Sequence, residues 1–575
     1  MQENSYYVTK KRMVALMLAS VFLFFLIFCR LFYIQILWGK NLQTKASDQW
    51  TRDLNLSAMR GDIVDKNGEI LATSCTVFNV YARPNAVVDK ESTAKVLAEA
   101  LSLDYQSVVQ KVNKKGVSEV LIARKVPTLL ANELKEKDLD GIYFAEESFR
   151  QYPLGDFLTQ VLGYVSVDGV GQTGIEAYYD KYLQGIDGRL LTQTDLVGKE
   201  LDGVQYYLPS QKGLTIKLTV DSKIQMMVEN VLDLAMYQYS PKKAECIVLD
   251  VTNGSVLAMS SKPSFDLNNI PRDDLQSLTD YSKNVLVTDI YEPGSTFKIV
   301  TAAACLEESL NGGGFDENYV FKNNSRTRVV DGTKINCWST HANGKHANQK
   351  LSDALNNSCN PIFTDIALNL GKETFYRYLE AFGFGSKTNL DFQGEQSGIL
   401  IDKSMVKNAD LARIGFGQSV TVTPLQLCMA TASSVNGGIL YQPRLVESIV
   451  DNVTGVTLTN PVVVKNRTIS EVTSQKLATM LEGVVTNGSG KQAYIEGYKI
   501  GGKTGTAQKF ENGALAQGKY VSSFIGFFPV NSPKYLVLML VDEPVGQNYG
   551  SVVAAPYAKM VIQGIIDLYD VAPVE

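Results

Sequence analysis

The sequence predicts a mixed α+β protein that is held in a membrane by one N-terminal helix, and two observations carry this prediction. Residues 13–37 form a single long apolar run, which is long enough to cross a bilayer as a helix. Strand-like patterns lie near both ends of residues 213–575, with helix-like patterns between them. Strands that flank a helical block in this way indicate one sheet assembled from distant segments, which is an α+β arrangement.

The apolar run is expected to be a retained single-pass anchor. Residues 13–29 carry no charge, and Arg30 can extend its charged group to the membrane surface. Three basic residues at positions 10–12 place the preceding tail, residues 1–12, in the cytoplasm by the positive-inside rule. A cleaved signal peptide is the alternative, but it requires a shorter apolar region and a small-residue cleavage site. We therefore expect the rest of the chain to lie outside the cytoplasm, at the cell membrane.

Residues 38–212 have the patterns of a mixed structural domain. Asn67-Gly68 between two apolar pairs predicts a β-hairpin, and residues 92–101 and 104–114 predict amphipathic helices. No pairing of a nucleophile with a base is found in this part of the sequence. We therefore interpret it as a pedestal that lifts the remainder of the chain away from the membrane.

Residues 213–575 begin and end with predicted strands. Residues 214–220 alternate like a strand, and Asp221 can cap the helix that is predicted over residues 222–237. Further expected elements are a hairpin around Thr252-Asn253-Gly254, strands at 522–528 and 535–541, and a closing helix at 552–569.

Composition narrows the classes of function. The 575 residues carry a formal net charge of −5, with 45% hydrophobic and 20% charged residues. The chain has no excess of basic residues, so its charge does not indicate a nucleic-acid partner. The seven cysteines are scattered without disulfide-like spacing, and there are only two histidines. A histidine-based mechanism would have to use one of those two residues.

The segment from Tyr291 to Lys298 is the candidate catalytic segment. Ser295 and Lys298 are three residues apart, so on a helix they share one face. Gly294 and the small residues that follow indicate a helix that begins near the serine. A serine hydroxyl needs a base, and a lysine one turn away can serve if burial or another cation keeps it partly neutral. The free N–H groups of a first helical turn also favour a developing oxyanion.

Two further motifs follow the first in a characteristic order. Ser-x-x-Lys is followed by Ser358-Cys359-Asn360 and then by Lys503-Thr504-Gly505-Thr506. Alone, the first motif would be weak evidence, but the three together are the signature set of penicillin-binding proteins and class A β-lactamases. A serine–histidine triad is the weaker account, because His341 and His346 lie in a loop-like stretch without a paired carboxylate nearby.

At these motifs the sequence resembles the class B penicillin-binding proteins, the monofunctional peptidoglycan transpeptidases, over nearly its whole length. Blocks at 60–72, 150–155 and 171–176 are similar to the family's pedestal motifs, and this agreement disfavours a small soluble β-lactamase. The bifunctional class A is disfavoured because no glycosyltransferase domain has room before the pedestal. The resemblance implies a pedestal (dimerisation) domain at 38–212 and a transpeptidase domain at 213–575. The latter would have an antiparallel sheet with helices on both faces and a helical subdomain. The pattern is closest to the division and sporulation branch.

The resemblance implies a role for each motif residue. Ser295 would attack the penultimate D-Ala carbonyl of a stem peptide, with Lys298 as general base. Ser358 would relay a proton to the leaving D-Ala, and Asn360 would hold Lys298 and the substrate amide. Lys503 would supply positive charge for the terminal carboxylate and help to keep Lys298 deprotonated.

The remaining strand residues are implied to bind substrate. Thr504 and Thr506 would donate to the same carboxylate, and Gly505 would let the peptide lie along the strand edge. The N–H groups of Ser295 and Thr506 would form the oxyanion hole. An amine of a second stem peptide would then resolve the acyl-enzyme, and no cofactor is required. Expected partners are stem peptides, β-lactam antibiotics, the membrane, a polytopic glycan polymerase and division or sporulation proteins.

Two alternatives remain open at this point. A D,D-carboxypeptidase would form the same acyl-enzyme and resolve it with water. A non-catalytic β-lactam sensor or scaffold would bind penicillin without turnover, although sensors of this kind usually carry more membrane spans and a cytoplasmic output. The tail at residues 1–12 gives such an output no room.

A structural zinc site is also expected at the edge of the active site. Both histidines lie within nine residues of Cys337, and Cys359 is inside the Ser-x-Asn motif. We expect Asp331, Cys337, His346 and Cys359 as ligands, because thiolate, imidazole and carboxylate suit tetrahedral Zn²⁺ and a closed site is structural. Family members often have a histidine shortly before this motif, which favours His346 over His341, although the choice stays open. The alternative is that the cysteines are small core residues and the histidines are solvated.

Overall fold

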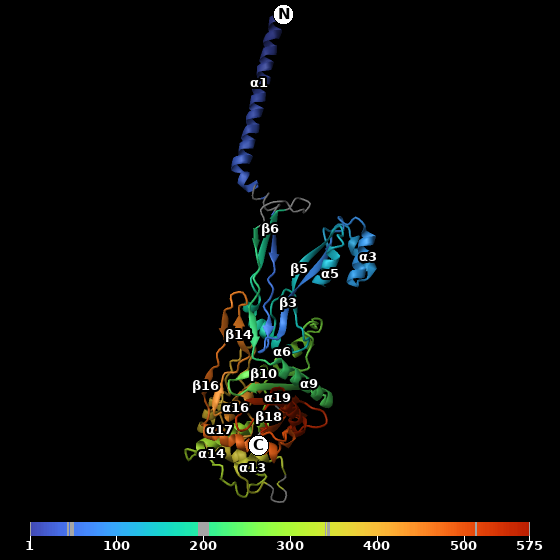
Figure 1. Ribbon diagram of the computed structural model, residues 1–575. Helices are drawn as coiled ribbons and strands as arrows, with labels where there is room; N and C mark the ends of the chain where they lie inside the picture. The colour runs from blue at the N-terminus through green and yellow to red at the C-terminus, as the bar shows by residue number, and fades with distance from the viewer. Residues whose placement is uncertain are drawn as a thin grey trace. The chain divides into compact units, whose positions relative to one another are not determined.

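The computed structural model describes residues 2–42, 45, 51–193, 206–339, 341, 346–511 and 514–573 (Figure 1). The chain divides into two compact units, Met1–Ala58 with Ile186–Lys212, and Met59–Gly185 with Gly213–Glu575. The first unit contains α1 (Gln2–Phe32), a π-helical turn (Tyr33–Leu37), and the antiparallel strands β1 (Thr51–Leu56), β6 (Gly188–Gln193) and β7 (Tyr206–Leu208).

The predicted anchor segment is helical. Within the segment Tyr7–Leu37, the most apolar window of 18 residues has a mean hydropathy of 2.5, and no residue of that window is buried. Apolar side chains that have no protein to pack against are what a lipid-facing helix presents. A second apolar stretch, Gly550–Tyr569, is half buried and consists of core helices of the second unit.

The pedestal part of the second unit is built on a seven-stranded sheet. Its strand order is β15-β14-β8-β2-β3-β4, and β5 pairs with β3. The predicted hairpin at Asn67-Gly68 joins β2 to β3, and the two predicted amphipathic helices are present as α3 and α4. The bounds are β2 (Ile63–Val64), β3 (Ile70–Ala82), α3 (Lys90–Leu101), α4 (Tyr105–Val112), β4 (Val120–Pro127), α5 (Thr128–Lys135) and β5 (Ile142–Gln151).

Buried ion pairs join the three pedestal blocks that were named in the sequence analysis, residues 60–72, 150–155 and 171–176. Arg60 and Arg150 each direct Nε to the carboxylate of Glu176, at 2.5 and 2.6 Å. All three side chains are almost fully buried. Charged side chains that are buried away from water must be paired, so we interpret these ion pairs as structural contacts within the pedestal.

A five-stranded antiparallel sheet forms the centre of the C-terminal part of the second unit, which follows the pedestal in the sequence. Its order is β10-β9-β19-β18-β17. Along β9, Cys246 and Val248 belong to the core with α9 and α19, whereas Ile247 and Leu249 belong to the larger core with α12 and α16. The prediction of helices on both faces is therefore confirmed. The strands are β9 (Lys243–Asp250), β10 (Ser255–Lys262), β17 (Gly501–Glu511), β18 (Ala514–Phe528) and β19 (Tyr535–Asp542), and the helices are α9 (Ser222–Tyr239), α12 (Lys298–Ser309), α16 (Pro424–Val435) and α19 (Ala555–Tyr569).

The other elements of this part complete the helical subdomain and the sheet edge. Strand β8 (Thr215–Leu218) joins β2 of the pedestal in parallel and pairs with β14 on its other side. The expected closing helix is interrupted, because Pro556 cannot donate a backbone hydrogen bond, and α18 precedes α19. The subdomain contains α13 (Leu351–Asn356), α14 (Asn360–Ala381), α15 (Asn408–Ile414) and α17 (Glu471–Thr486), beside α18 (Gly550–Val553), β14 (Val446–Val450) and β15 (Thr457–Thr459).

Candidate active site

Ser295, the candidate nucleophile, lies on a short 3-10 turn, η2 (Gly294–Phe297), that leads directly into α12. The predicted helix thus begins at Lys298, and the serine itself lies in the tighter turn that precedes it. Ser295 is partly exposed, whereas Thr296 and Phe297 on the same turn are fully buried. The two residues after the serine therefore fix the turn in the core, while the serine side chain remains accessible to solvent.

Lys298 has the surroundings of a general base. Its side chain is fully buried, and Nζ lies 2.8 Å from the Ser358 carbonyl oxygen, 3.1 Å from Ser358 Oγ and 2.7 Å from Asn360 Oδ1. Burial lowers the pKa of Lys298 to about 7, although the nearby thiols of Cys359 and Cys337 act in the opposite direction. An amine with this pKa is partly neutral at neutral pH and can accept the serine proton.

The Ser-x-Asn motif turns the chain sharply into α14. Ser358 has a left-handed backbone with φ of 53°, which is unusual for a residue other than glycine and is held by its surroundings. Asn360 is the first residue of α14, and its Nδ2 donates to the Asn336 carbonyl oxygen at 3.1 Å. The amide of Asn360 therefore bridges Lys298 and the loop around Asn336.

The Lys-Thr-Gly-Thr motif lies on β17, at the free edge of the central sheet. Lys503 is fully buried, and its pKa is well below the ordinary value because of burial, with a further contribution from the charge of Lys298. A carboxylate that arrives beside Lys503 would favour its charged form again. Thr504 Oγ1 donates to Ser489 Oγ at 3.0 Å, and Thr506 Oγ1 accepts from the Gly550 amide at 3.0 Å.

The nucleophile turn packs directly on β17. A Cβ atom at Gly294 would lie 3.3 Å from the Ala507 Cβ atom and 3.6 Å from the Thr506 carbonyl oxygen. A Cβ atom at Gly505 would lie 3.2 Å from the Pro293 carbonyl oxygen and 3.1 Å from Thr296 Cγ2. Glycines at these two positions let the turn and the strand edge approach, so the three motifs form one site.

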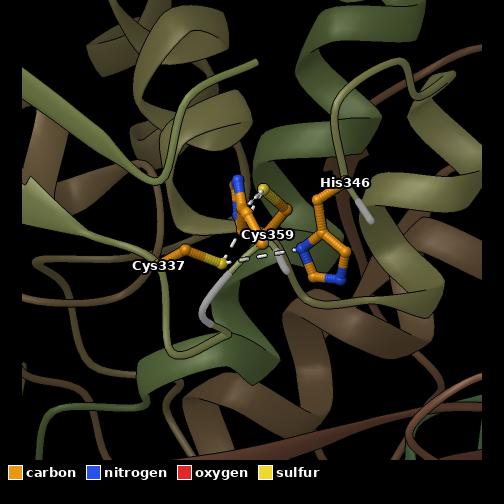
Figure 2. Close-up of side chains that lie close together, drawn as sticks. Cys337, His346 and Cys359 are labelled. Atoms are coloured by element: carbon orange, nitrogen blue, oxygen red, sulfur yellow. Dashed lines mark hydrogen bonds between the residues drawn. The ribbon is translucent and has the colours of Figure 1, made fainter. Parts of the chain in front are cut away.

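A group of four metal-binding side chains lies beside this site. The donor atoms of Cys337, His341, His346 and Cys359 all lie within 4.8 Å of one another. Figure 2 shows Cys337, His346 and Cys359 directed towards one another from separate parts of the chain. The two sulfur atoms are 3.9 Å apart, Cys337 Sγ is 3.7 Å from His346 Nδ1, and Cys359 Sγ is 4.0 Å from His341 Nε2. Donors of a tetrahedral Zn²⁺ site lie roughly 3.4–3.8 Å apart, so the four donors lie slightly farther apart than such an ion requires and would have to move closer together to hold it.

The composition of this group differs from the expected ligand set at one position. Asp331 is exposed at the turn between β11 (Thr327–Val330) and β12 (Thr333–Asn336), and His341 takes its place among the donors. The carboxylate was expected because it precedes Cys337 closely in sequence, but the hairpin turn carries it to the surface. His341 and His346 both have left-handed backbones, with φ of 57° and 70°. Such conformations are kept by other interactions, and a shared ion would be one.

Asn324 supports the four donors and was not identified in the sequence analysis. Its carbonyl oxygen lies 3.3 Å from His341 Nδ1, which directs Nε2 of the same ring towards Cys359. This is the usual second contact of a metal-binding histidine. Asn324 Nδ2 donates to Cys359 Sγ at 3.2 Å. Hydrogen bonds from Cys337 and Asn324 hold the pKa of Cys359 below its ordinary value, which favours the metal-binding thiolate.

Two models of known protein families match this chain. The model described as the penicillin binding protein transpeptidase domain matches residues 245–563. The model described as the penicillin-binding protein dimerisation domain matches residues 55–218. Together they cover the central sheet, the three motifs and the pedestal sheet.

Individual relatives match over nearly the whole chain. Stage V sporulation protein D of Bacillus subtilis is 40% identical over 571 residues, which cover 98% of this chain and 86% of that protein. Peptidoglycan D,D-transpeptidase FtsI of Escherichia coli is 28% identical over 552 residues, which cover 95% and 89%. The structure of penicillin binding protein 2X from Streptococcus thermophilus has the same fold, with a TM-score of 0.77 at 22% identity over 90% of this chain and 80% of that one. Because the transpeptidase model matches more than half of the chain and the Bacillus relative spans nearly all of it, the chain belongs to the class B penicillin-binding proteins.

Proposed function

We propose that this chain is a serine-type peptidoglycan D,D-transpeptidase that cross-links stem peptides during septal or spore cell-wall synthesis. The observation that carries the proposal is the buried amine of Lys298, which follows Ser295 by one turn and contacts both polar residues of the Ser-x-Asn motif. The name of the Bacillus relative supports a role in sporulation. β-Lactams, which resemble the D-Ala-D-Ala end of the substrate, would acylate the same serine.

The proposed reaction proceeds through an acyl-enzyme. Neutral Lys298 accepts the hydroxyl proton as Ser295 Oγ bonds to the penultimate D-Ala carbonyl carbon. The oxyanion is stabilised by the N–H groups of Ser295 and Thr506. As the bond to the terminal D-Ala breaks, the proton passes by way of Ser358 to the leaving amine. An amine of a second stem peptide then bonds to the acyl carbon and gives up a proton to the same base. The bond between that carbon and Ser295 Oγ breaks, and the base returns the proton to the serine oxygen.

Substrate binding would use the edge of β17. The peptide would add as a further strand beside Gly505, because β17 is the edge strand of the central sheet and its outer backbone groups can pair with an extended peptide. Lys503, Thr504 and Thr506 would hold the terminal carboxylate, and Asn360 would hold the substrate amide. No cofactor enters any step.

Substitution of the nucleophile tests this proposal. The Ser295→Ala variant should lose all covalent labelling by a fluorescent penicillin and should melt at the same temperature as the parent protein. Labelling that persists would refute the assignment of Ser295. Incubation of the parent with donor and acceptor stem peptides then separates the alternatives: cross-linked dimers support transpeptidation, and trimmed monomers alone support a carboxypeptidase.

The membrane topology and the cellular role are part of the same proposal. We infer a cytoplasmic tail at residues 1–12, an anchor at 13–37, a pedestal at 38–212 and an extracytoplasmic transpeptidase domain at 213–575. The basic residues before the apolar helix support this orientation. A polytopic glycan polymerase is the expected partner. A fluorescent fusion at the division site supports septal synthesis, whereas one around the forespore supports spore-wall synthesis.

We also propose that Cys337, His341, His346 and Cys359 hold one structural Zn²⁺. Four protein donors close the site, so it would not activate water. The position of the proposed ion indicates what it would do, because its ligand Cys359 lies between Ser358 and Asn360, the two residues that contact Lys298. A bound ion would therefore fix the Ser-x-Asn motif to the loop before it, and loss of the ion would loosen the partners of the base.

Metal analysis of the protein, purified without added metal, decides this second proposal. We expect about one equivalent of zinc, and chelation should lower the melting temperature and slow acylation together. His341→Ala should lose zinc, whereas the matched variant Asp331→Ala should keep it. Zinc retained in His341→Ala but lost in Asp331→Ala would restore the original ligand set. Less than about a tenth of an equivalent in the parent would mean that the four residues hold no metal.

A further inference from the structure

One loop that no catalytic motif includes lies directly against the nucleophile turn. This support loop, residues 415–422, follows α15 and makes backbone contacts along the segment that precedes Ser295. Gly294 N donates to the Gly417 carbonyl oxygen at 2.9 Å. Tyr291 and Val422 exchange two backbone hydrogen bonds, each 3.0 Å long. The support loop thus acts as a short strand beside the segment that presents the nucleophile.

The backbone of the support loop at Gly417 lies so close to the backbone at Gly294 that no side chain fits between them. A Cβ atom at Gly417 would lie 2.0 Å from the Gly294 carbonyl oxygen, and Gly417 also has φ of +82°. On the opposite side, Thr301 Oγ1 of α12 donates to the Gly415 carbonyl oxygen at 2.8 Å. A displacement of the support loop would therefore move the turn that carries Ser295.

One side chain from the nucleophile segment holds this loop in place. Glu292 Oε1 accepts a hydrogen bond from the Ser419 amide at 2.9 Å. Ser419 has a left-handed backbone with φ of 57°, so its conformation needs support from its surroundings. Burial raises the pKa of the Glu292 carboxyl group, whereas the Ser419 amide and the charge of Arg413, near the end of α15, act in the opposite direction.

We propose that Glu292 is a positioning residue: its carboxylate holds Ser419 and the support loop against the nucleophile turn, and thereby fixes Ser295 for attack. The proposal rests on the proposed function, because it concerns the rate at which Ser295 is acylated. Glu292 itself need not touch substrate. A serine displaced by about 1 Å can react about a hundredfold more slowly, so a contact of this kind matters for the rate.

Rapid-mixing kinetics with a chromogenic β-lactam on the full-length protein in detergent tests the proposal. The measurement separates the dissociation constant of the first complex from the rate constant of acylation. Glu292→Ala should reduce the acylation rate constant by about tenfold to a hundredfold and leave the dissociation constant nearly unchanged. The final amount of acyl-enzyme should remain one per chain. Failure of the parent protein to acylate at Ser295 would refute the proposed function instead.

Two conservative changes distinguish the hydrogen bond from other roles of Glu292. Glu292→Gln keeps an acceptor oxygen at the same reach and should stay within about threefold of the parent rate constant. Ser419→Gly keeps the amide and removes the strain, so in the Glu292→Ala background it should recover part of the lost rate. A Gln variant as slow as the Ala variant would overturn the proposal.

Glu307 provides a matched control for general destabilisation. It is also a partly buried carboxylate that accepts from a backbone amide at 2.9 Å, that of Ser470, but it lies at the far end of α12. Glu307→Ala should lower the melting temperature and leave the acylation rate constant unchanged. An equal loss of rate in both Ala variants, or no loss in Glu292→Ala, would overturn the positioning role.

Discussion

The amine of Lys298 is the group on which the proposed chemistry depends, and its surroundings favour the neutral form. Burial is the largest cause of its lowered pKa, and the polar atoms of Ser358 and Asn360 accept its hydrogen bonds. Lys503 is expected to help keep Lys298 deprotonated, and the charge of Lys298 lowers the pKa of Lys503 beside the larger effect of burial; the repulsion between the two amines acts on both of them. Two buried lysines in one site can therefore both lose their protons easily, and a substrate carboxylate beside Lys503 would favour the charged form of that lysine.

The pH dependence of acylation follows from the pKa of Lys298. Below a pH of about 7 the amine is protonated and cannot accept the serine proton, so the rate constant should fall as the pH falls. Above that pH the base is neutral, and the rate constant should reach a plateau. Stopped-flow acylation between pH 5.5 and 9, at constant ionic strength, measures the midpoint. A rate constant that does not change over this range would remove Lys298 from the role of base, provided that the melting temperature is also constant.

At the scale of elements, helices and strands with a strong sequence pattern could be predicted from the sequence. Contacts between segments that are distant in the sequence could not. The hairpin around Gly254 and helix α9, whose cap Asp221 accepts from the Lys223 and Ile224 amides, follow from local signals. Asn324 and the support loop have no such signal, because their partners lie far away in sequence. Asp331 was expected among the zinc ligands, but it lies outside the group of four donors. It is close to Cys337 in the sequence, yet the hairpin between β11 and β12 places it at an exposed turn.

The approach of the nucleophile turn to β17 gives a prediction for Gly505. A Cβ atom there would lie 2.3 Å from Ser523 Oγ and 3.2 Å from the Pro293 carbonyl oxygen. Gly505→Ala should therefore push the turn away from the strand and slow acylation by about tenfold or more. The control is Gly313→Ala, whose Cβ atom would have its nearest contact at 3.4 Å. Acylation at the parent rate in Gly505→Ala would show that the turn tolerates displacement.

At the scale of the whole molecule, the pedestal and the transpeptidase part share one sheet. Strand β8 still falls within the residues that the dimerisation model matches, and it lies between β2 of the pedestal and β14, which falls within the residues that the transpeptidase model matches. The order of the domains could be predicted from the motif blocks, but this shared sheet could not, because β14 pairs with β8 across more than two hundred residues and β2 pairs with β8 across more than one hundred and fifty. All proposed catalytic and metal-binding residues lie within this second unit.

Removal of the apolar helix tests the roles of these parts. A protein without residues 1–40 lacks the segment Tyr7–Leu37, whereas the other apolar stretch, Gly550–Tyr569, is packed against the central sheet. We therefore expect a soluble protein that is acylated by β-lactams at the rate of the full-length chain in detergent, because every site residue is retained. Sedimentation with and without added lipid vesicles, followed by penicillin labelling, measures both properties, and the same truncation with Ser295→Ala corrects for non-covalent label. If the truncated protein still sedimented wholly with the vesicles, a second membrane-binding surface would have to exist among residues 41–575.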